Sequence, residues 1–140
     1  MNALFDHFGR LHAWVYRHNG RLGRRFAWIP CLVLVTTGRK SGQRRESVLV
    51  YAEDGDRCVV VASNGGSDHP PGWLFNVEAQ PAVEVQVGTD RYAAAATVVG
   101  VDDPDHARLW KLVNAINHNR YDGYQSKTTR PIPLVVLART

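Results

Sequence analysis

The stretch LVLVTTGRKSGQRRESVLVY, residues 32–51, joins two apolar runs through a turn that carries two glycines. Runs rich in Val, Leu and Thr predict β-strands, and glycines between them predict a tight turn. Four cations fall in or directly after this turn: Arg39, Lys40, Arg44 and Arg45. The stretch therefore predicts two strands with a basic connection, which is either a site for phosphate or carboxylate or a solvated turn.

Similar short runs predict further strands at residues 57–63, 82–88, 91–100 and 134–138, beside those at 31–37 and 46–53. The unbroken apolar runs CLVLV and CVVVA indicate strands that are covered on both faces. Val83, Val85 and Val87 alternate with polar residues, which indicates a half-exposed strand. Because turn signals such as DGD and GTD separate the runs, we expect an antiparallel sheet curled into a barrel.

Two helical patterns complete the expected fold. Residues 2–19 read as an amphipathic helix, and a second helix opens at residues 102–104 with Leu109, Trp110, Val113 and Ile116 as its apolar stripe. A chain of 140 residues suits one domain. We therefore expect an α+β fold, with an N-terminal helix and basic lead-in over residues 1–28 and the barrel domain over 29–140.

The positive charge is concentrated in the first third of the chain. Residues 1–45 carry nine Lys and Arg against one acid, whereas residues 46–140 have a net charge of −4. Such a patch favours an anionic partner, but the acidic second part and the lack of interleaved aromatic residues argue against nucleic acid. Neither the histidines nor Cys31 and Cys58 have metal-ligand spacing, so we expect no metal. Without a signal peptide or spanning segment, the predicted location is cytoplasmic.

Two further stretches are candidates for binding or catalysis. In VASNGGSDHPPGWLFN, residues 61–76, the glycines would let the backbone approach a planar ligand, and Trp73 is either a core residue or a ligand contact. In YDGYQ, Tyr121 and Tyr124 lie three residues apart. Two phenols on one face could donate hydrogen bonds or a proton to a bound substrate, but the pattern taken alone favours one surface and one buried tyrosine.

In order along the chain, the motifs TTGRKSG, ASNGG, P-x-W-x-x-N-x-x-x-x-P, Y-x-x-Y-Q and R-x-I-P resemble those of the deazaflavin-dependent nitroreductase family. These proteins are actinobacterial flavin/deazaflavin oxidoreductases with a split β-barrel fold. The similarity runs from about residue 29 to the C-terminus. It implies hydride transfer from reduced coenzyme F-420, an 8-hydroxy-5-deazaflavin with a phosphate and several carboxylates in its tail, to a small acceptor such as a quinone, enone or nitroaromatic.

The resemblance also implies site residues. The phosphate and anionic tail would be held by Arg39, Lys40, Ser41 and Arg45. Residues lining the cofactor or closing over it would be Glu46, Ser47, Val48, Leu49, Val50, Val61, Ala62, Ser63, Asn64, Gly72, Trp73, Leu74, Phe75 and Asn76. Tyr121 resembles the family's tyrosine beside the reactive ring, a candidate proton donor or orienter, and Tyr124 its supporting neighbour.

Alternatives to this function stay open at the level of sequence. The same barrel could hold FMN, or the chain could be a non-catalytic module that carries a cofactor. The basic face of the first helix is also compatible with contact with an anionic membrane surface. A homodimer is a further expectation, because split barrels often pair.

Overall fold

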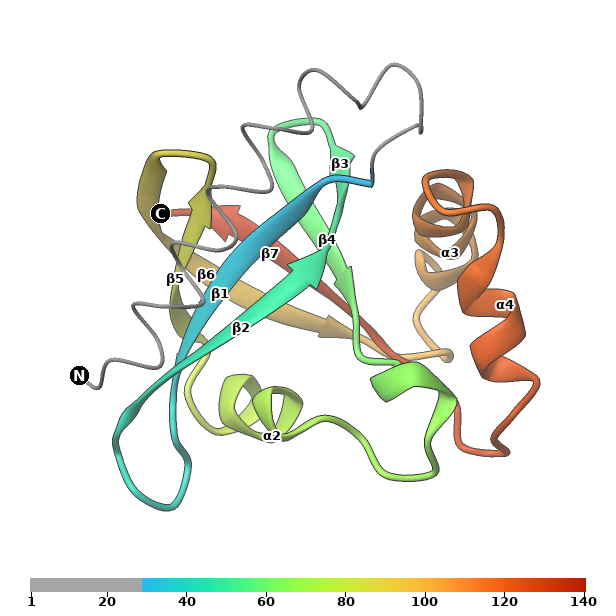
Figure 1. Cartoon of the computed structure of the whole chain (residues 1–140), viewed down its shortest axis with the longest axis horizontal. Helices are drawn as coiled ribbons and strands as arrows, with labels where there is room; N and C mark the ends of the chain where they lie inside the picture. Colours follow the sequence, from blue (N-terminus) through green and yellow to red (C-terminus); the bar gives the residue numbers. More distant parts are fainter. Residues whose placement is uncertain (1–28) are drawn as a thin grey trace.

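A computed structural model of the chain describes residues 29–140, which form one curled antiparallel sheet with helices at its ends (Figure 1). The strands are β1 (Cys31–Thr37), β2 (Arg44–Val50), β3 (Ala52–Asp54), β4 (Arg57–Val61), β5 (Ala82–Val87), β6 (Asp90–Val99) and β7 (Leu134–Arg139). The helices are η1 (Asn64–Gly66), α2 (Gly72–Ala79), α3 (His106–Ala115) and α4 (Arg120–Gln125). The predicted antiparallel sheet of an α+β domain is confirmed.

The sheet closes on itself because its two edge strands are consecutive in the chain. The strand order is β2-β1-β5-β6-β7-β4-β3, and only Tyr51 separates β2 from β3. The backbone N–H of Tyr51 donates to the carbonyl of Pro30 at 3.1 Å. The sequence predicted a single strand over residues 46–53. That prediction is wrong in this detail, because the chain leaves β1 at Tyr51 and pairs with β4 instead.

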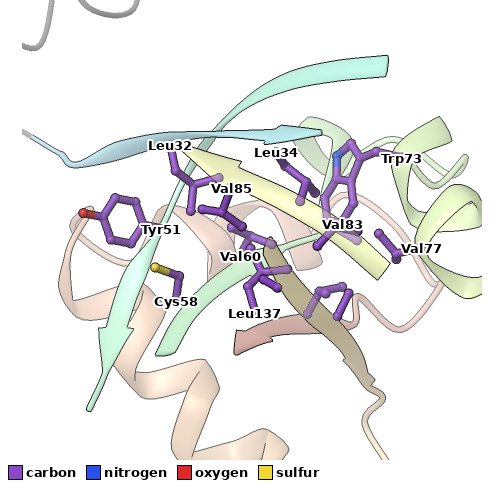
Figure 2. Packing of buried hydrophobic residues seen from close by; sticks show 14 of the residues in the cluster. Leu32, Leu34, Tyr51, Cys58, Val60, Trp73, Val77, Val83, Val85 and Leu137 are labelled. Carbon is purple, nitrogen blue, oxygen red and sulfur yellow. The ribbon is translucent and has the colours of Figure 1, made fainter. Parts of the chain in front are cut away.

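Two apolar clusters lie on the two faces of the curled sheet. Inside the barrel, side chains from five strands pack against three residues of α2, Trp73, Leu74 and Val77 (Figure 2). On the outer face, residues of β4 and β7 pack against Leu109 and Val113 of α3. Because β4 alternates between the two clusters, its apolar run is unbroken, as predicted.

The second predicted helix is α3, and its buried stripe is as expected. Leu109 and Val113 are fully buried, and Trp110 and Ile116 pack beside them at partial exposure. The first predicted helix, residues 2–19, and the division at residue 28 lie outside the described residues. None of the helices between residues 29 and 140 combines the length and apolar character needed to cross a bilayer.

An ion-pair network fixes α3 to the β3–β4 hairpin. The guanidinium of Arg108 donates to both carboxylate oxygens of Asp54, at 2.9 and 3.1 Å, and to Asp105 at 2.8 Å. Arg57 also pairs with Asp54. These hydrogen bonds, first from Arg108 and then from Arg57, lower the pKa of Asp54 to about 2. The carboxylate therefore stabilises the fold while it is ionised.

We expect Asp54→Asn to lower the free energy of unfolding by about 1 kcal/mol or less near neutral pH. An unfolded aspartate has a pKa of about 3.9, so the stabilisation by Asp54 is present above about pH 4 and is lost as the pH falls toward 2. Thermal unfolding from pH 7 to 2.5 should show a smaller acid destabilisation in the variant than in the wild type. Asp56→Asn, in the same hairpin turn, is the control, and identical pH profiles for the two variants would contradict the assignment.

Candidate active site

The basic turn between β1 and β2 has a fixed backbone. The Gly38 N–H donates to the carbonyl of Gln43 at 2.7 Å, and the Gly42 N–H donates to the carbonyl of Gly38 at 2.8 Å. Gly42 has φ of 72°, and a Cβ at Gly38 would lie 2.6 Å from the hydroxyl of Ser41. Gly42 therefore favours glycine because of its backbone conformation, and a side chain at Gly38 would crowd Ser41.

Helix α2 holds this turn through Asn76, which is almost fully buried. Its carboxamide oxygen accepts from the backbone N–H of Arg39 at 3.0 Å, and its NH₂ group donates to the hydroxyl of Thr36 at 3.1 Å. The guanidinium of Arg39 lies over the ring of Phe75, 4.6 Å from its centroid. The start of the turn is thus fixed to a helix that lies far from it in sequence, and Figure 1 shows α2 beside the strands that carry the turn.

A basic cavity of about 490 Å³ lies between the turn and α2. It is lined by Gly38, Arg39, Lys40, Ser41, Arg45, Glu46, Ser47, Gly72, Trp73 and Asn76. Arg44 does not line this cavity, because it pairs with Glu84 on β5 at 2.9 Å and lies 3.5 Å from Glu46. Arg39, Lys40 and Arg45 therefore line one hollow, whereas the charge of Arg44 is paired with carboxylates.

A second cavity, which we call the ring cavity, has a volume of about 380 Å³. It is lined by Ile29, Val48, Leu49, Val50, Val61, Ser63, Asn64, Gly65, Pro71, Trp73, Asn117, Arg120, Tyr121 and Tyr124. Trp73 lines both cavities, so the two hollows adjoin at this residue. The remainder of Trp73 packs in the core, which fixes this shared wall. Trp73 is therefore a core residue, as one of its two predictions had it, and it also lines both cavities.

The two tyrosines of YDGYQ form one side of the ring cavity. Their rings meet edge to face, with centroids 6.1 Å apart. Tyr121 is only 6% exposed, and burial is the main cause that raises its pKa to about 12. No hydrogen bond within residues 29–140 occupies its hydroxyl. A buried phenol that faces a cavity without a partner is available to a ligand.

The glycine loop, residues 63–67, is held by an arginine from the R-x-I-P motif. Arg130 donates to the carbonyl oxygens of Ser63 and Ser67, both at 2.8 Å, and of Ala62 at 3.2 Å. Burial lowers the pKa of its guanidinium, and the carboxylate of Asp68 opposes that shift. The loop also packs tightly on α4, because a Cβ at Gly66 would lie 2.8 Å from the Tyr124 carbonyl oxygen.

The structure brings most of the predicted site residues to the two cavities. Three line neither: Ala62 and Leu74 lie in the core, and Phe75 contacts Arg39 from below the turn. Sequence reasoning missed six lining residues: Ile29, Gly38, Gly65, Pro71, Asn117 and Arg120. Gly38 lies in the motif TTGRKSG and Gly65 in ASNGG, so the motifs could have identified both residues. Asn117 and Arg120 had no signal beyond their nearness to Tyr121.

A protein-family model described as F420H(2)-dependent quinone reductase matches residues 8–139. An F420H(2)-dependent quinone reductase of Mycobacterium tuberculosis is 52% identical over 132 residues, which cover 93% of this chain and 89% of that protein. The chain belongs to the F420H(2)-dependent quinone reductase family. The resemblance seen in the motifs is thereby confirmed at the level of the family.

Solved structures place the fold of this quinone reductase family member among known ones. A structure of an F420-H2 dependent reductase, FDR-A, is 35% identical and matches with a TM-score of 0.68, covering 77% of this chain and 93% of that chain. Another, described as a domain-swapped dimer, is 31% identical with a TM-score of 0.69 and covers 89% and 96%. The predicted split barrel is confirmed.

We expect Arg130→Lys to destabilise the glycine loop, because the ammonium of lysine cannot reproduce the planar guanidinium that donates to three carbonyl oxygens. Charged hydrogen bonds contribute about 1.5–3 kcal/mol each, so a loss of about 2 kcal/mol in the free energy of unfolding is expected. Urea denaturation measures it, and amide exchange at Ser63 to Ser67 should quicken. Arg139→Lys is the control, since Arg139 is an exposed partner of Asp90. Equal stability of the two variants would contradict the role of Arg130.

Proposed function

We propose that this protein transfers hydride from reduced coenzyme F-420 to a small organic acceptor of the quinone type. The observation that carries the proposal is the pair of cavities joined at Trp73, one basic and one mainly apolar. A coenzyme with a polyanionic tail and a flat ring needs both environments side by side. Membership in the F420H(2)-dependent quinone reductase family supports the same function.

The basic cavity suits the phosphate and carboxylates of the tail. Arg39, Lys40 and Arg45 all line it, and the hydroxyls of Ser41 and Ser47 add neutral hydrogen-bonding groups. Guanidinium groups bind phosphate and carboxylate through two parallel hydrogen bonds, whereas an ammonium acts as a point charge. Because Asn76 fixes the backbone of Arg39, little ordering of the turn is needed on binding.

The ring cavity suits a planar heterocycle. Val48, Val50 and Val61 give it apolar walls, and Trp73 closes the side toward the basic cavity. When bound, the reduced deazaflavin supplies two electrons to the acceptor as hydride. The protein's own tasks are then to place the two reactants in contact and to exclude water, and the backbone of the glycine loop can approach closely for this purpose.

Tyr121 is the proposed donor to the acceptor. Because burial raises the pKa of its phenol to about 12, the hydroxyl stays protonated at neutral pH. It can therefore donate a hydrogen bond to an acceptor oxygen that gains negative charge, without having to release its proton first. Tyr124 supports it edge to face and is in turn covered by the ammonium of Lys127, 5.7 Å from its ring centroid.

The basic cavity is tested by a matched pair of charge removals in the same turn. Lys40→Gln should weaken binding of coenzyme F-420 about tenfold and reduce its salt dependence, because one charge-assisted contact contributes about 1.5 kcal/mol or more. Arg44→Gln should have a much smaller effect, since Arg44 lies outside the cavity, pairs with Glu84 and acts on the cavity only through Glu46. Fluorescence titration at two ionic strengths measures the dissociation constants, and equal weakening by both changes would remove the assignment.

Tyr121→Phe should lower kcat for quinone reduction about tenfold to a hundredfold and change the dissociation constant of the coenzyme little. The reason is that the hydroxyl acts on charge that develops only during the reaction. Tyr92→Phe is the control, because Tyr92 contacts Cys58 and lines neither cavity. Stopped-flow oxidation of the reduced coenzyme separates the two effects. Parallel losses in kcat and in coenzyme affinity would count against a role in the reaction.

The same titrations decide between coenzyme F-420 and FMN. Tighter binding of FMN, with no binding of coenzyme F-420, would replace the proposed coenzyme and leave the two cavities as its site. Pairing of two chains and membrane contact through the N-terminal residues remain predictions from the sequence, tested by solution mass and by co-sedimentation with anionic vesicles.

A further inference from the structure

Three hydrogen-bond donors meet at the α4 side of the ring cavity, and two of them had no predicted role. They are the carboxamide of Asn117, the guanidinium of Arg120 and the hydroxyl of Tyr121. Neighbouring polar groups on α3 and α4 bind one another instead: Asp122 accepts from the indole N–H of Trp110 at 2.7 Å and donates from its backbone to Asn114. Asp122, Trp110 and Asn114 are thus occupied with one another, whereas Asn117, Arg120 and Tyr121 line the ring cavity.

Asn117 is 3% exposed, and one end of its carboxamide has a partner. Its Oδ1 accepts from the backbone N–H of Arg120 at 3.3 Å, which orients the NH₂ group away from that contact. Across residues 29–140 no acceptor is found for this NH₂ group. A buried amide donor without a partner carries a desolvation cost that a ligand oxygen would remove.

Arg120 supplies a positive charge at the same place. Its guanidinium makes no ion pair with any carboxylate of residues 29–140, unlike Arg44, Arg57, Arg108 and Arg139. Burial raises the pKa of the Tyr121 phenol, and the charge of Arg120 acts in the opposite direction. Arg120 and Tyr124 are four residues apart on α4, so they share the helix face that borders the cavity.

The backbone that delivers these residues is strained. His118 and Asn119 both adopt left-handed conformations, with φ of 59° and 62°. Two consecutive non-glycine residues in this region are uncommon, because a Cβ crowds the backbone there. They allow the chain to turn between the end of α3 and the start of α4 while Asn117, Arg120 and Tyr121 all border one cavity.

We propose that Asn117, Arg120 and Tyr121 form an oxyanion site that binds the carbonyl oxygen of the acceptor. The inference rests on the proposed function and adds two residues that contact the substrate. Hydride transfer places two electrons and one proton on a quinone and leaves a hydroquinone monoanion. The three donors stabilise the charge on its oxygen, and a proton from solvent completes the hydroquinone. Overall the quinone gains two electrons and two protons, because a hydride comes from the reduced coenzyme, and the proton taken from solvent is balanced by one that the oxidised coenzyme releases to solvent.

Binding of para-nitrophenol to the protein alone tests the site without any coenzyme. Its phenolate absorbs visible light, so a titration reports both affinity and ionisation of the bound probe. The wild type should bind the phenolate in preference to the neutral phenol, and Arg120→Gln should weaken this binding about 10- to 100-fold. Arg120→Lys should recover part of the loss. Arg91→Gln, the same change on the β5–β6 hairpin, should bind like the wild type.

A second measurement follows the reaction itself. With coenzyme F-420 bound, Arg120→Gln and Asn117→Ala should each lower kcat/KM for a quinone at least tenfold, and coenzyme affinity should stay within about twofold of the wild type. No phenolate binding by the wild type, or equal binding by Arg120→Gln and Arg91→Gln, overturns the oxyanion site. Failure of the wild type to bind coenzyme F-420 would instead overturn the proposed function, and the phenolate titration would still decide the site.

Discussion

The closure of the sheet at Tyr51 is the constraint on which the site depends. Since β2 and β3 are opposite edges of the sheet and only one residue separates them, the sheet must curl until those edges meet. The ring cavity lies along this seam, with Val48 to Val50 of β2 on one side and Val61 of β4 on the other. The cavity is therefore a product of the barrel's topology and needs no additional domain to form it.

The loops around the cavities are fixed by a few polar side chains from distant parts of the chain. Asn76 holds the basic turn, and Arg130 holds the glycine loop. Backbone groups in a loop have no neighbouring strand to bind. A side chain such as that of Asn76 or Arg130 therefore supplies the hydrogen bonds that a neighbouring strand would supply in a sheet. Asn76 both lines the basic cavity and fixes its turn, whereas the charges of Lys40 and Arg120 are not used for support, which favours preorganisation of the site.

The strands could be predicted from the sequence because burial on two faces leaves a local pattern. The unbroken run of β4 and the alternation in β5 both follow from which faces are covered. The break at Tyr51 could not be predicted, because strand propensity continues through it and the choice of a new partner strand is a tertiary effect. Helix α2 after Pro71 has eight residues, and the packing of Trp73, Leu74 and Val77 on the core, which is also a tertiary effect, stabilises it.

The motifs predicted which segments of the chain form the site, but not which side chains in those segments line the cavities. Arg44 and Arg45 look equivalent in sequence, yet neighbouring residues on a strand point to opposite faces, and only Arg45 lines the basic cavity. Asn117 and Arg120 lie in a polar connection whose role depends on two left-handed residues, and no composition rule signals that geometry.

The position of β7 has a consequence for the order in which the sheet can form. Strand β7 lies between β6 and β4, so the β3–β4 hairpin is hydrogen-bonded to the rest of the sheet only through residues 134–139. The glycine loop likewise depends on Arg130, which precedes β7 and lies far from the loop in sequence. Pairing of such distant segments has an entropic cost that must be met before the new contacts stabilise the fold, so the docking of β7 is expected late in folding, and the coenzyme can stabilise the fold only after that step.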